Sequence, residues 1–214
     1  MKKIVSILSI LAFTVSAYSQ GLKPVKIDSV VTASLPAKYD MKDTAGQKIF
    51  SGNGALGYMI VIRTANNNEP LKKEKDLNNV FKEYITKIQG QSSGSILNSR
   101  DTTIGNLKAK VFELETNDEN GLEMRNFTVL YTKEALYTFE YVYPGSRKDI
   151  IKDETKAFFG SISVSDDLQR TDQYTNTSAS STSPFGKIAI FGGAAALLLA
   201  GYFIYKKKTE TSMS

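Results

Sequence analysis

The 214-residue sequence contains no cysteine, no histidine and no tryptophan. Without histidine or cysteine, the chain cannot form a Ser-His-Asp or Cys-His catalytic arrangement, and it has no ligands for a zinc finger or an iron–sulfur cluster. Disulfide bonds are excluded for the same reason. The rest of the composition, 41% hydrophobic and 23% charged, is typical of a globular protein.

An excess of positive charge is also missing from the body of the chain. The formal charge of +5 comes entirely from lysines in the two end segments, 1–19 and 187–214, so that residues 20–186 are formally neutral. A basic surface is the electrostatic requirement for binding nucleic acid. We therefore expect no nucleic-acid partner.

The chain has two long apolar runs, and the first belongs to residues 1–19, which have the three zones of a secretory signal peptide. Two lysines open this segment, an apolar run follows over 4–15, and Ala17 and Ser19 place small side chains where a signal peptidase reads the sequence. We expect cleavage before Gln20. An uncleaved anchor is the alternative, but a span takes about 20 apolar residues and this run is shorter.

The second apolar run, Ile188 to Tyr205, contains no charged residue and is flanked by one lysine before it and three after it. As a helix it would be about 27 Å long, which is close to the hydrocarbon thickness of a bilayer. The excess of lysine after the run predicts a cytoplasmic C-terminus. We expect a single-pass transmembrane helix over 187–205 and a short basic tail over 206–214. A buried core helix and a cell-wall sorting signal are the alternatives, and the LPxTG-type motif of the latter is absent.

Residues 166–186 are rich in serine and threonine and show no apolar periodicity. Such a segment buries too little surface to offset its ordering entropy, so we expect a flexible stalk. Together, the signal peptide, stalk and anchor predict a cell-membrane protein. Its globular domain, 20–165, would lie outside the cytoplasm, in the periplasm or at the cell surface.

The first half of this domain predicts strands followed by a helix. Short strands are expected at 30–35, 47–51 and 58–64, and the last is apolar on both faces, as in a central strand covered on both sides. Residues 71–89 carry one apolar stripe with helical spacing, and Gly90 is expected to end this helix.

The second half predicts four closely spaced strands and a second helix. The strands are expected at 95–103, 107–116, 122–131 and 135–143, joined by short turns as in a meander of hairpins. Ser146 and Asp149 have the spacing of a helix cap. The whole order predicts an antiparallel sheet of six or seven strands with two helices packed on it, in the α+β class.

Three segments carry a resemblance to a known family. These are ASLP at 33–36, MIVIR at 59–63 and FFGSI at 158–162. With the order of the elements, they resemble the PsbP-like fold, which is named after an extrinsic subunit of photosystem II and is also used by bacterial extracytoplasmic proteins. The resemblance implies a non-enzymatic binding or assembly module attached to a larger complex. It transfers no functional residue, because none can be matched.

Two motifs have a functional and a structural interpretation. The sequence GNGALG at 52–57 matches G-x-G-x-x-G, but a strand follows it where a dinucleotide site needs a helix, so we interpret it as a hairpin turn. Acidic side chains also gather near one predicted turn, at Glu113, Glu115, Asp118, Glu119 and Glu123. Their spacing is not that of an EF-hand, which favours an exposed turn over a calcium site.

Aromatic residues alternate along two neighbouring predicted strands. One strand carries Tyr137, Phe139, Tyr141 and Tyr143, and the other carries Phe127, Val129 and Tyr131, where a valine stands between two aromatic residues. An exposed face of this kind could stack sugars or bases. Because two amphipathic helices need a surface to pack on, we expect these side chains to form the core.

The sequence therefore assigns no catalytic residue, no cofactor-binding residue and no metal ligand. Our leading hypothesis is a membrane-tethered, non-enzymatic module of a bacterial envelope that binds a protein partner. One alternative is a carboxylate-based hydrolase of envelope polymers, which a pocket joining two carboxylates with raised pKa values would favour. The other is a lipid or small-ligand carrier, which would need an apolar cavity between sheet and helix.

Overall fold

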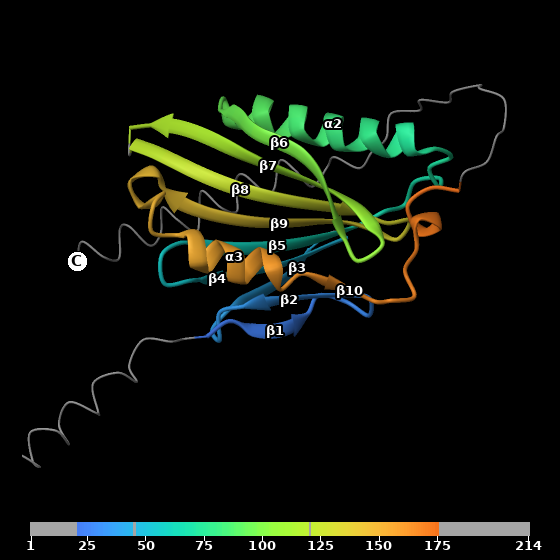
Figure 1. Ribbon diagram of the computed structural model, residues 1–214, viewed down its shortest axis with the longest axis horizontal. Coiled ribbons are helices and arrows are strands. Elements are labelled where there is room, and N and C mark those ends of the chain that lie inside the picture. Colours follow the sequence, from blue (N-terminus) through green and yellow to red (C-terminus); the bar gives the residue numbers. More distant parts are fainter. Residues whose placement is uncertain (1–20, 45, 120, 176–214) are drawn as a thin grey trace, which may run out of the picture.

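The alternating apolar residues of the chain form a large antiparallel sheet with the order β3-β4-β5-β9-β8-β7-β6 (Figure 1). The computed structural model describes residues 21–44, 46–119 and 121–175. The strands of this sheet are β3 (Asp40–Thr44), β4 (Gln47–Asn53), β5 (Tyr58–Ala65), β6 (Ser95–Ile104), β7 (Leu107–Asp118), β8 (Gly121–Tyr131) and β9 (Ala135–Pro144). A smaller sheet has the order β1-β2-β10, formed by β1 (Lys23–Lys26), β2 (Val31–Leu35) and β10 (Ser163–Val164).

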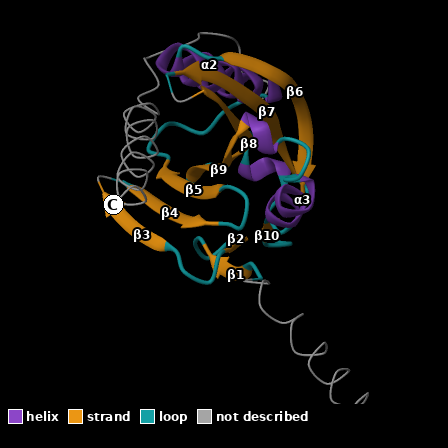
Figure 2. Cartoon of the chain, turned by 90° about the vertical axis from the view of Figure 1, so that its left-hand side faces the viewer, coloured by secondary structure: helices purple, strands orange, loops and turns teal. Residues whose placement is uncertain are grey.

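Two α-helices of the described chain pack on the large sheet, α2 (Glu74–Ser92) and α3 (Lys152–Gly160). Single 3₁₀ turns, η1 (Gly145–Arg147) and η2 (Arg170–Asp172), flank α3 in the sequence. Figure 2 shows α2 and α3 separated by strands of the large sheet. The α+β class predicted from the sequence is confirmed.

Each face of the large sheet has its own core. One face packs against α2 through Leu77, Val80 and Tyr84, and the opposite face packs against β2 and α3. This arrangement follows from β9, where Tyr137, Phe139, Tyr141 and Tyr143 point to the α3 side and Leu136 points to the α2 side. Strand β5 is buried on both faces, which confirms the prediction of a central strand.

The alternating aromatic residues are core residues, as expected. The four on β9 are at most 3% exposed, and Phe127, Val129 and Tyr131 on β8 are at most 2% exposed. The two sets lie on opposite faces, since Phe127 pairs with Glu140 and Val129 with Thr138. Tyr84 of α2 reaches across its core to Thr138, with a distance of 2.8 Å between the hydroxyl oxygens. The aromatic residues therefore present no exposed stacking face.

The large sheet has seven strands, within the six or seven that were predicted, but the predicted strand β2 lies in a separate small sheet and the described residues form ten strands in all. Strands β1, β3 and β10 were not expected. The sequences of β1 and β3, KPVK and DMKDT, lack apolar alternation, and β10 has two residues. All three lie at sheet edges, where pairing with a neighbour suffices and little side-chain burial is needed.

The predicted ends of both helices are wrong by several residues. Helix α2 runs through Gly90 to Ser92, whose hydroxyl donates to the carbonyl of Ile88 at 2.9 Å, and Ser93 ends the helix at a φ of 53°. The predicted cap at Ser146 and Asp149 does not form, because residues 145–147 make η1 and α3 begins at Lys152. Ile151, the residue before α3, is buried and 4% exposed.

The domain continues past the predicted boundary at residue 165. Residues 166–175 contain η2, and Gln173 and Tyr174 are 0% and 4% exposed, so this part of the predicted stalk is folded. The predicted signal peptide, the rest of the stalk, the span at 187–205 and the tail lie outside the described residues. Within the described part of the chain, no helix is long and apolar enough to cross a membrane.

Candidate functional site

The last described segment, 165–175, crosses the end of the domain and is called the C-terminal strap here. Its first residue, Ser165, donates its backbone N–H to the carbonyl of Val30 at 2.8 Å. Its last residues pair with the segment before α2, where Leu71 and Tyr174 form a parallel bridge and the N–H of Thr175 donates to the carbonyl of Leu71 at 2.9 Å. The strap is therefore held against the domain as far as Thr175.

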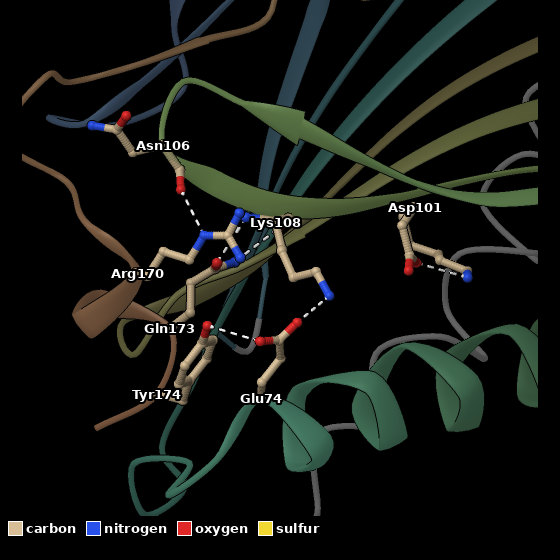
Figure 3. Close-up of polar contacts among 8 residues, drawn as sticks. Glu74, Asp101, Asn106, Lys108, Arg170, Gln173 and Tyr174 are labelled. Carbon is tan, nitrogen blue, oxygen red and sulfur yellow. Dashed lines mark hydrogen bonds and ion pairs between the residues drawn. The ribbon is translucent and has the colours of Figure 1, made fainter. Parts of the chain in front are cut away.

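Gln173 is the centre of the strap and is completely buried (Figure 3). Its carboxamide accepts the N–H of Lys108 at 2.8 Å and donates to the carbonyls of Lys108 and Tyr131 at 2.7 and 2.9 Å. The side chain thereby joins the backbone of β7 at Lys108 to that of β8 at Tyr131, next to the Ala109–Leu130 pair of the ladder. Three backbone groups depend on this one residue.

Polar contacts hold the strap and the start of α2 against β7. Glu74 forms an ion pair with Lys108, and the Tyr174 hydroxyl donates to the other Glu74 oxygen at 3.4 Å (Figure 3). The hydrogen bond from Lys108 lowers the pKa of Glu74. On the far side of the strap, Arg170 donates to the carbonyl of Asn106 at 3.2 Å. The strap, helix and sheet are thus connected by charged groups as well as by burial.

An open groove of about 420 Å³ lies between α2 and strands β6 and β7. Its lining residues are Asn78, Phe81, Lys82, Ile85, Thr86 and Gln89 on the helix, and Ile96, Ser99, Asp101 and Lys110 on the strands. Lys110 and Asp101 form an ion pair at 2.9 Å across its sheet side. Apolar and polar side chains both line the groove, and Asp101 is the single carboxylate among them.

The GNGALG motif is the hairpin loop between β4 and β5, as predicted, and it holds an internal carboxylate. The backbone N–H groups of Ala55 and Leu56 donate to the two oxygens of Glu154 at 2.7 and 2.8 Å, and the Tyr141 hydroxyl donates to Glu154 at 3.0 Å. Consecutive backbone N–H groups of this kind form an anion-binding nest. Here the anion is a side chain of α3, so the loop fixes the helix to the sheet.

The acidic cluster lies on strands β7 and β8 and on the turn that joins them, which is the turn predicted from the sequence. Glu113 accepts the Asn98 amide at 3.1 Å, and Glu123 accepts Arg125 at 2.7 Å, so these two carboxylates have separate partners. In the described residues, no group of three or more acidic side chains could hold a metal ion.

Two carboxylates contact one guanidinium on the α2 side of the large sheet. Arg125 contacts Glu123 at 2.7 Å and Glu140 at 3.4 Å, and the Glu140 side chain is 4% exposed. Burial raises the pKa of Glu140, although Arg125 opposes this effect. A raised carboxyl pKa is what a general acid needs, but here both carboxylates are ion-pair partners of Arg125. The arrangement is therefore that of a structural ion-pair cluster.

A second buried polar cluster joins the small sheet to the large one. Asp28 accepts Arg63 at 2.7 Å, the Tyr137 hydroxyl at 2.6 Å and two backbone N–H groups. Burial disfavours the charged form of Asp28, but these hydrogen bonds outweigh it and lower the pKa. For Tyr137, burial and the nearby Asp28 raise the pKa. This cluster is a structural connection between β1–β2 and β9.

The fold is similar to that of a cyanobacterial PsbP (CyanoP) from Synechocystis sp. PCC 6803. The two share 15% identity with a TM-score of 0.52, over 70% of this chain and 96% of the other. Two more distant structures are a Bacteroides thetaiotaomicron VPI-5482 protein (11% identity, TM-score 0.38, 64% of this chain and 46% of that one) and LpqN, involved in cell envelope biogenesis of Mycobacterium tuberculosis (9% identity, TM-score 0.42, 68% and 91%). No family model and no curated protein matches the sequence.

The chain therefore has a PsbP-like fold, as its sequence pattern indicated. The residues that organise its two ends, Gln173 and Glu154, were not found by sequence reasoning. Gln173 lies in a polar segment with no periodicity, so nothing distinguished it from a linker residue. Glu154 had a possible signal, because an acidic residue in the first turn of a helix and a glycine-rich loop are chemically complementary.

Proposed function

We propose that this protein is a membrane-tethered, non-enzymatic binding or assembly module whose folded domain lies outside the cytoplasm. The observation that carries the proposal is the C-terminal strap. It holds the chain against α2 and β7 as far as Thr175, and the predicted membrane span begins a short distance further along the sequence. The anchor would thus act on a fixed point of the domain.

The buried chemistry supports a binding role over the hydrolase alternative. Glu123 and Glu140 are the carboxylates that meet, and both contact Arg125. A paired-carboxylate hydrolase needs its two groups several ångströms apart on either side of an accessible bond. The 420 Å³ groove between α2 and strands β6 and β7 contains Asp101 as its single carboxylate, in an ion pair with Lys110.

The packing also favours a binding module over a lipid carrier. Both faces of the sheet are covered by large side chains, among them Phe112, Tyr131 and Phe139, which are completely buried. A carrier would need an enclosed apolar cavity, and sites for small ligands are mostly apolar and concave. The groove beside α2 is open and is rimmed by polar and charged side chains.

The tether would also limit how far the domain lies from the bilayer. Residues 176–186 lie between the last described residue, Thr175, and the predicted span. Eleven residues reach at most roughly 40 Å when fully extended. The domain would therefore act close to the membrane, with the strap end nearest to it.

The tether is tested by fractionation of a bacterial host that expresses the full chain. The full chain should stay in the membrane pellet after alkaline carbonate extraction, and protease added outside the cytoplasmic membrane should cleave it. A stop codon after Gly186 should release the domain into the extracytoplasmic soluble fraction, whereas a stop codon after Glu210 should not. A full chain recovered from the cytosol, or a Gly186 stop variant that stays in the pellet, would contradict the tether.

A further inference from the structure

Strands β3 and β6 are the two edge strands of the large sheet in the described part of the chain. Natural proteins protect sheet edges with short strands and with charged side chains. Strand β3 has both protections, because it has five residues, DMKDT, and three of them are charged. Strand β6 has ten residues, of which only Arg100 and Asp101 are charged. The β6 edge is therefore the less protected of the two.

The backbone groups on the outer side of β6 follow from the contacts on its inner side. Lys108 of β7 directs its N–H and carbonyl to the Gln173 side chain, away from β6. Thr103 lies opposite Lys108, so these two residues form a pair without backbone hydrogen bonds between them. The N–H and carbonyl of Thr103 therefore point away from β7, and by alternation those of Asp101 do so as well. Among the described residues, no other segment bonds to these four groups.

A β-bulge limits the length of this edge. The register of the β6–β7 ladder shifts between Leu97 and Arg100, and Asn98 has a φ of 50°. Over residues 100–104 the ladder is regular. Because a bulge interrupts pairing with a longer strand, the edge fits an extended segment of about five residues.

The groove beside α2 lies along the same edge. Asp101 and its ladder partner Lys110 line the groove from the sheet, and Figure 3 shows Asp101 on the side of the sheet that faces α2. Opposite residues of neighbouring strands share a face of the sheet. A residue of an added strand opposite Asp101 would therefore point toward the groove. The groove offers that residue apolar contacts with Phe81, Ile85 and Ile96.

The charge at this edge indicates which side chains a ligand carries. Lys82, which lines the groove, and Arg100 are exposed, and neither has an ion-pair partner among the described residues. Asp101 is already paired with Lys110 at 2.9 Å. Since opposite charges on paired strands stabilise the pairing, the edge favours a segment with a carboxylate. A symmetric contact between two copies would instead bring these cations together.

We propose that residues 100–104 and the adjoining groove bind a short extended segment of another extracytoplasmic protein as an added antiparallel strand. The segment carries apolar side chains opposite Asp101 and Thr103, and a carboxylate opposite Arg100. Two backbone hydrogen bonds at Asp101 and two at Thr103 hold the segment, and the groove selects its apolar side chains. This proposal rests on the proposed function, because it names the class of partner that the binding module holds.

The probe is a synthetic peptide, Thr-Ile-Thr-Ile-Glu, with fluorescein at its C-terminus. It is titrated with the purified full chain in non-ionic detergent, and binding is followed by fluorescence anisotropy. In the proposed register, its isoleucines lie opposite Thr103 and Asp101, and its glutamate lies opposite Arg100. N-methylation of both isoleucines removes the N–H groups that donate to β6, and it should weaken binding by about 30-fold, the effect of two hydrogen bonds. The matched control is N-methylation of both threonines, whose N–H groups point away from β6, and this peptide should bind like the parent.

Charge reversal on the protein tests the register of the added strand. Arg100→Glu should weaken binding of the probe by about 5-fold, and it should strengthen binding of a peptide that ends in lysine instead of glutamate. Lys42→Glu is the matched control, because Lys42 is exposed on β3, the other edge strand. Lys42→Glu should leave the binding of both peptides unchanged. Both replaced side chains are exposed, so neither substitution should shift the unfolding midpoint.

Four results would overturn the edge site. They are no saturable binding of the probe up to about 1 mM, equal weakening by the two methylation patterns, equal effects of Arg100→Glu and Lys42→Glu, and a dimeric chain that the probe dissociates. The last result would assign the edge to a second copy. Peptide binding is measured on the purified chain and does not depend on the tether. A failed edge site is therefore distinguished from a failed anchor, which the fractionation reports.

Discussion

Replacing Gln173 with alanine tests whether the strap is part of the folded domain. The substitution removes hydrogen bonds from the backbone N–H and carbonyl of Lys108 and from the carbonyl of Tyr131, at distances of 2.7 to 2.9 Å. Gln173 is completely buried, so water reaches these groups only if the strap moves. Each lost partner costs about 1 kcal/mol, which gives a total of roughly 3 kcal/mol. That is a large part of the stability of a typical domain.

This loss is measured as the free energy of unfolding in urea titrations of the full chain in detergent. Tyrosine fluorescence reports the transition, because the chain has no tryptophan. In a thermal scan of the same samples, a loss of about 3 kcal/mol corresponds to a fall of roughly 9 °C in the midpoint. Gln169→Ala is the matched control, because Gln169 is exposed in the same segment and its amide makes one hydrogen bond, to the carbonyl of Asp166 at 3.2 Å.

The control should change stability by less than about 0.5 kcal/mol, as surface substitutions do. The reasoning is refuted if Gln173→Ala and Gln169→Ala have the same small effect. Such a result would mean that the strap does not add to the stability of the fold and that the flexible stalk begins near residue 166, as the sequence pattern predicts.

Four further substitutions test other parts of the structure by urea unfolding. Gly57→Ala places a Cβ atom 2.5 Å from the Tyr141 ring and should lower the free energy of unfolding by about 1–3 kcal/mol. Gly90→Ala lies in open space on α2 and should raise it by up to about 1 kcal/mol. Equal effects of the two substitutions would contradict the packing around Gly57. The lowered pKa of Asp28 contributes stability that is present above the ordinary carboxyl pKa and is lost as pH falls through the folded-state pKa. Asp28→Asn should therefore make the free energy of unfolding less dependent on pH in the acid range. An unchanged pH dependence would exclude this role of Asp28. The raised pKa of Glu140 has the opposite effect, because stability falls as pH rises from the ordinary carboxyl pKa through the folded-state pKa. Glu140→Gln should remove that fall in stability. A fall of the same size in the variant would contradict this role of Glu140.

The central part of the fold follows directly from the sequence pattern. The hairpins β6–β9 are found within one to two residues of their predicted positions, because strict alternation and short polar turns specify both the strands and their register. The aromatic alternation on β9 identified core residues for the same reason. Strands β1 and β3 could not be predicted, since polar residues form them and only pairing with β2 and β4 holds them in place.

The two ends of the domain depend on contacts between residues that are far apart in the chain. Gln173 bonds to Lys108, 65 residues away, and Glu154 bonds to Ala55, 99 residues away. Local propensity carries no information about such pairs, so the strap was interpreted as a stalk and η1 as the cap of a helix. The candidate sites therefore came from the structure, whereas the class of fold came from the sequence.

The central claim, a folded extracytoplasmic domain tethered through its strap, is tested most directly by mild proteolysis of sealed membranes that carry the full chain. The account predicts that protease on the extracytoplasmic side releases one folded fragment whose mass places its C-terminus between residues 176 and 186. The remaining C-terminal piece should stay in the membrane. Cleavage first within 166–175, or release of the complete chain without cleavage, would contradict the account.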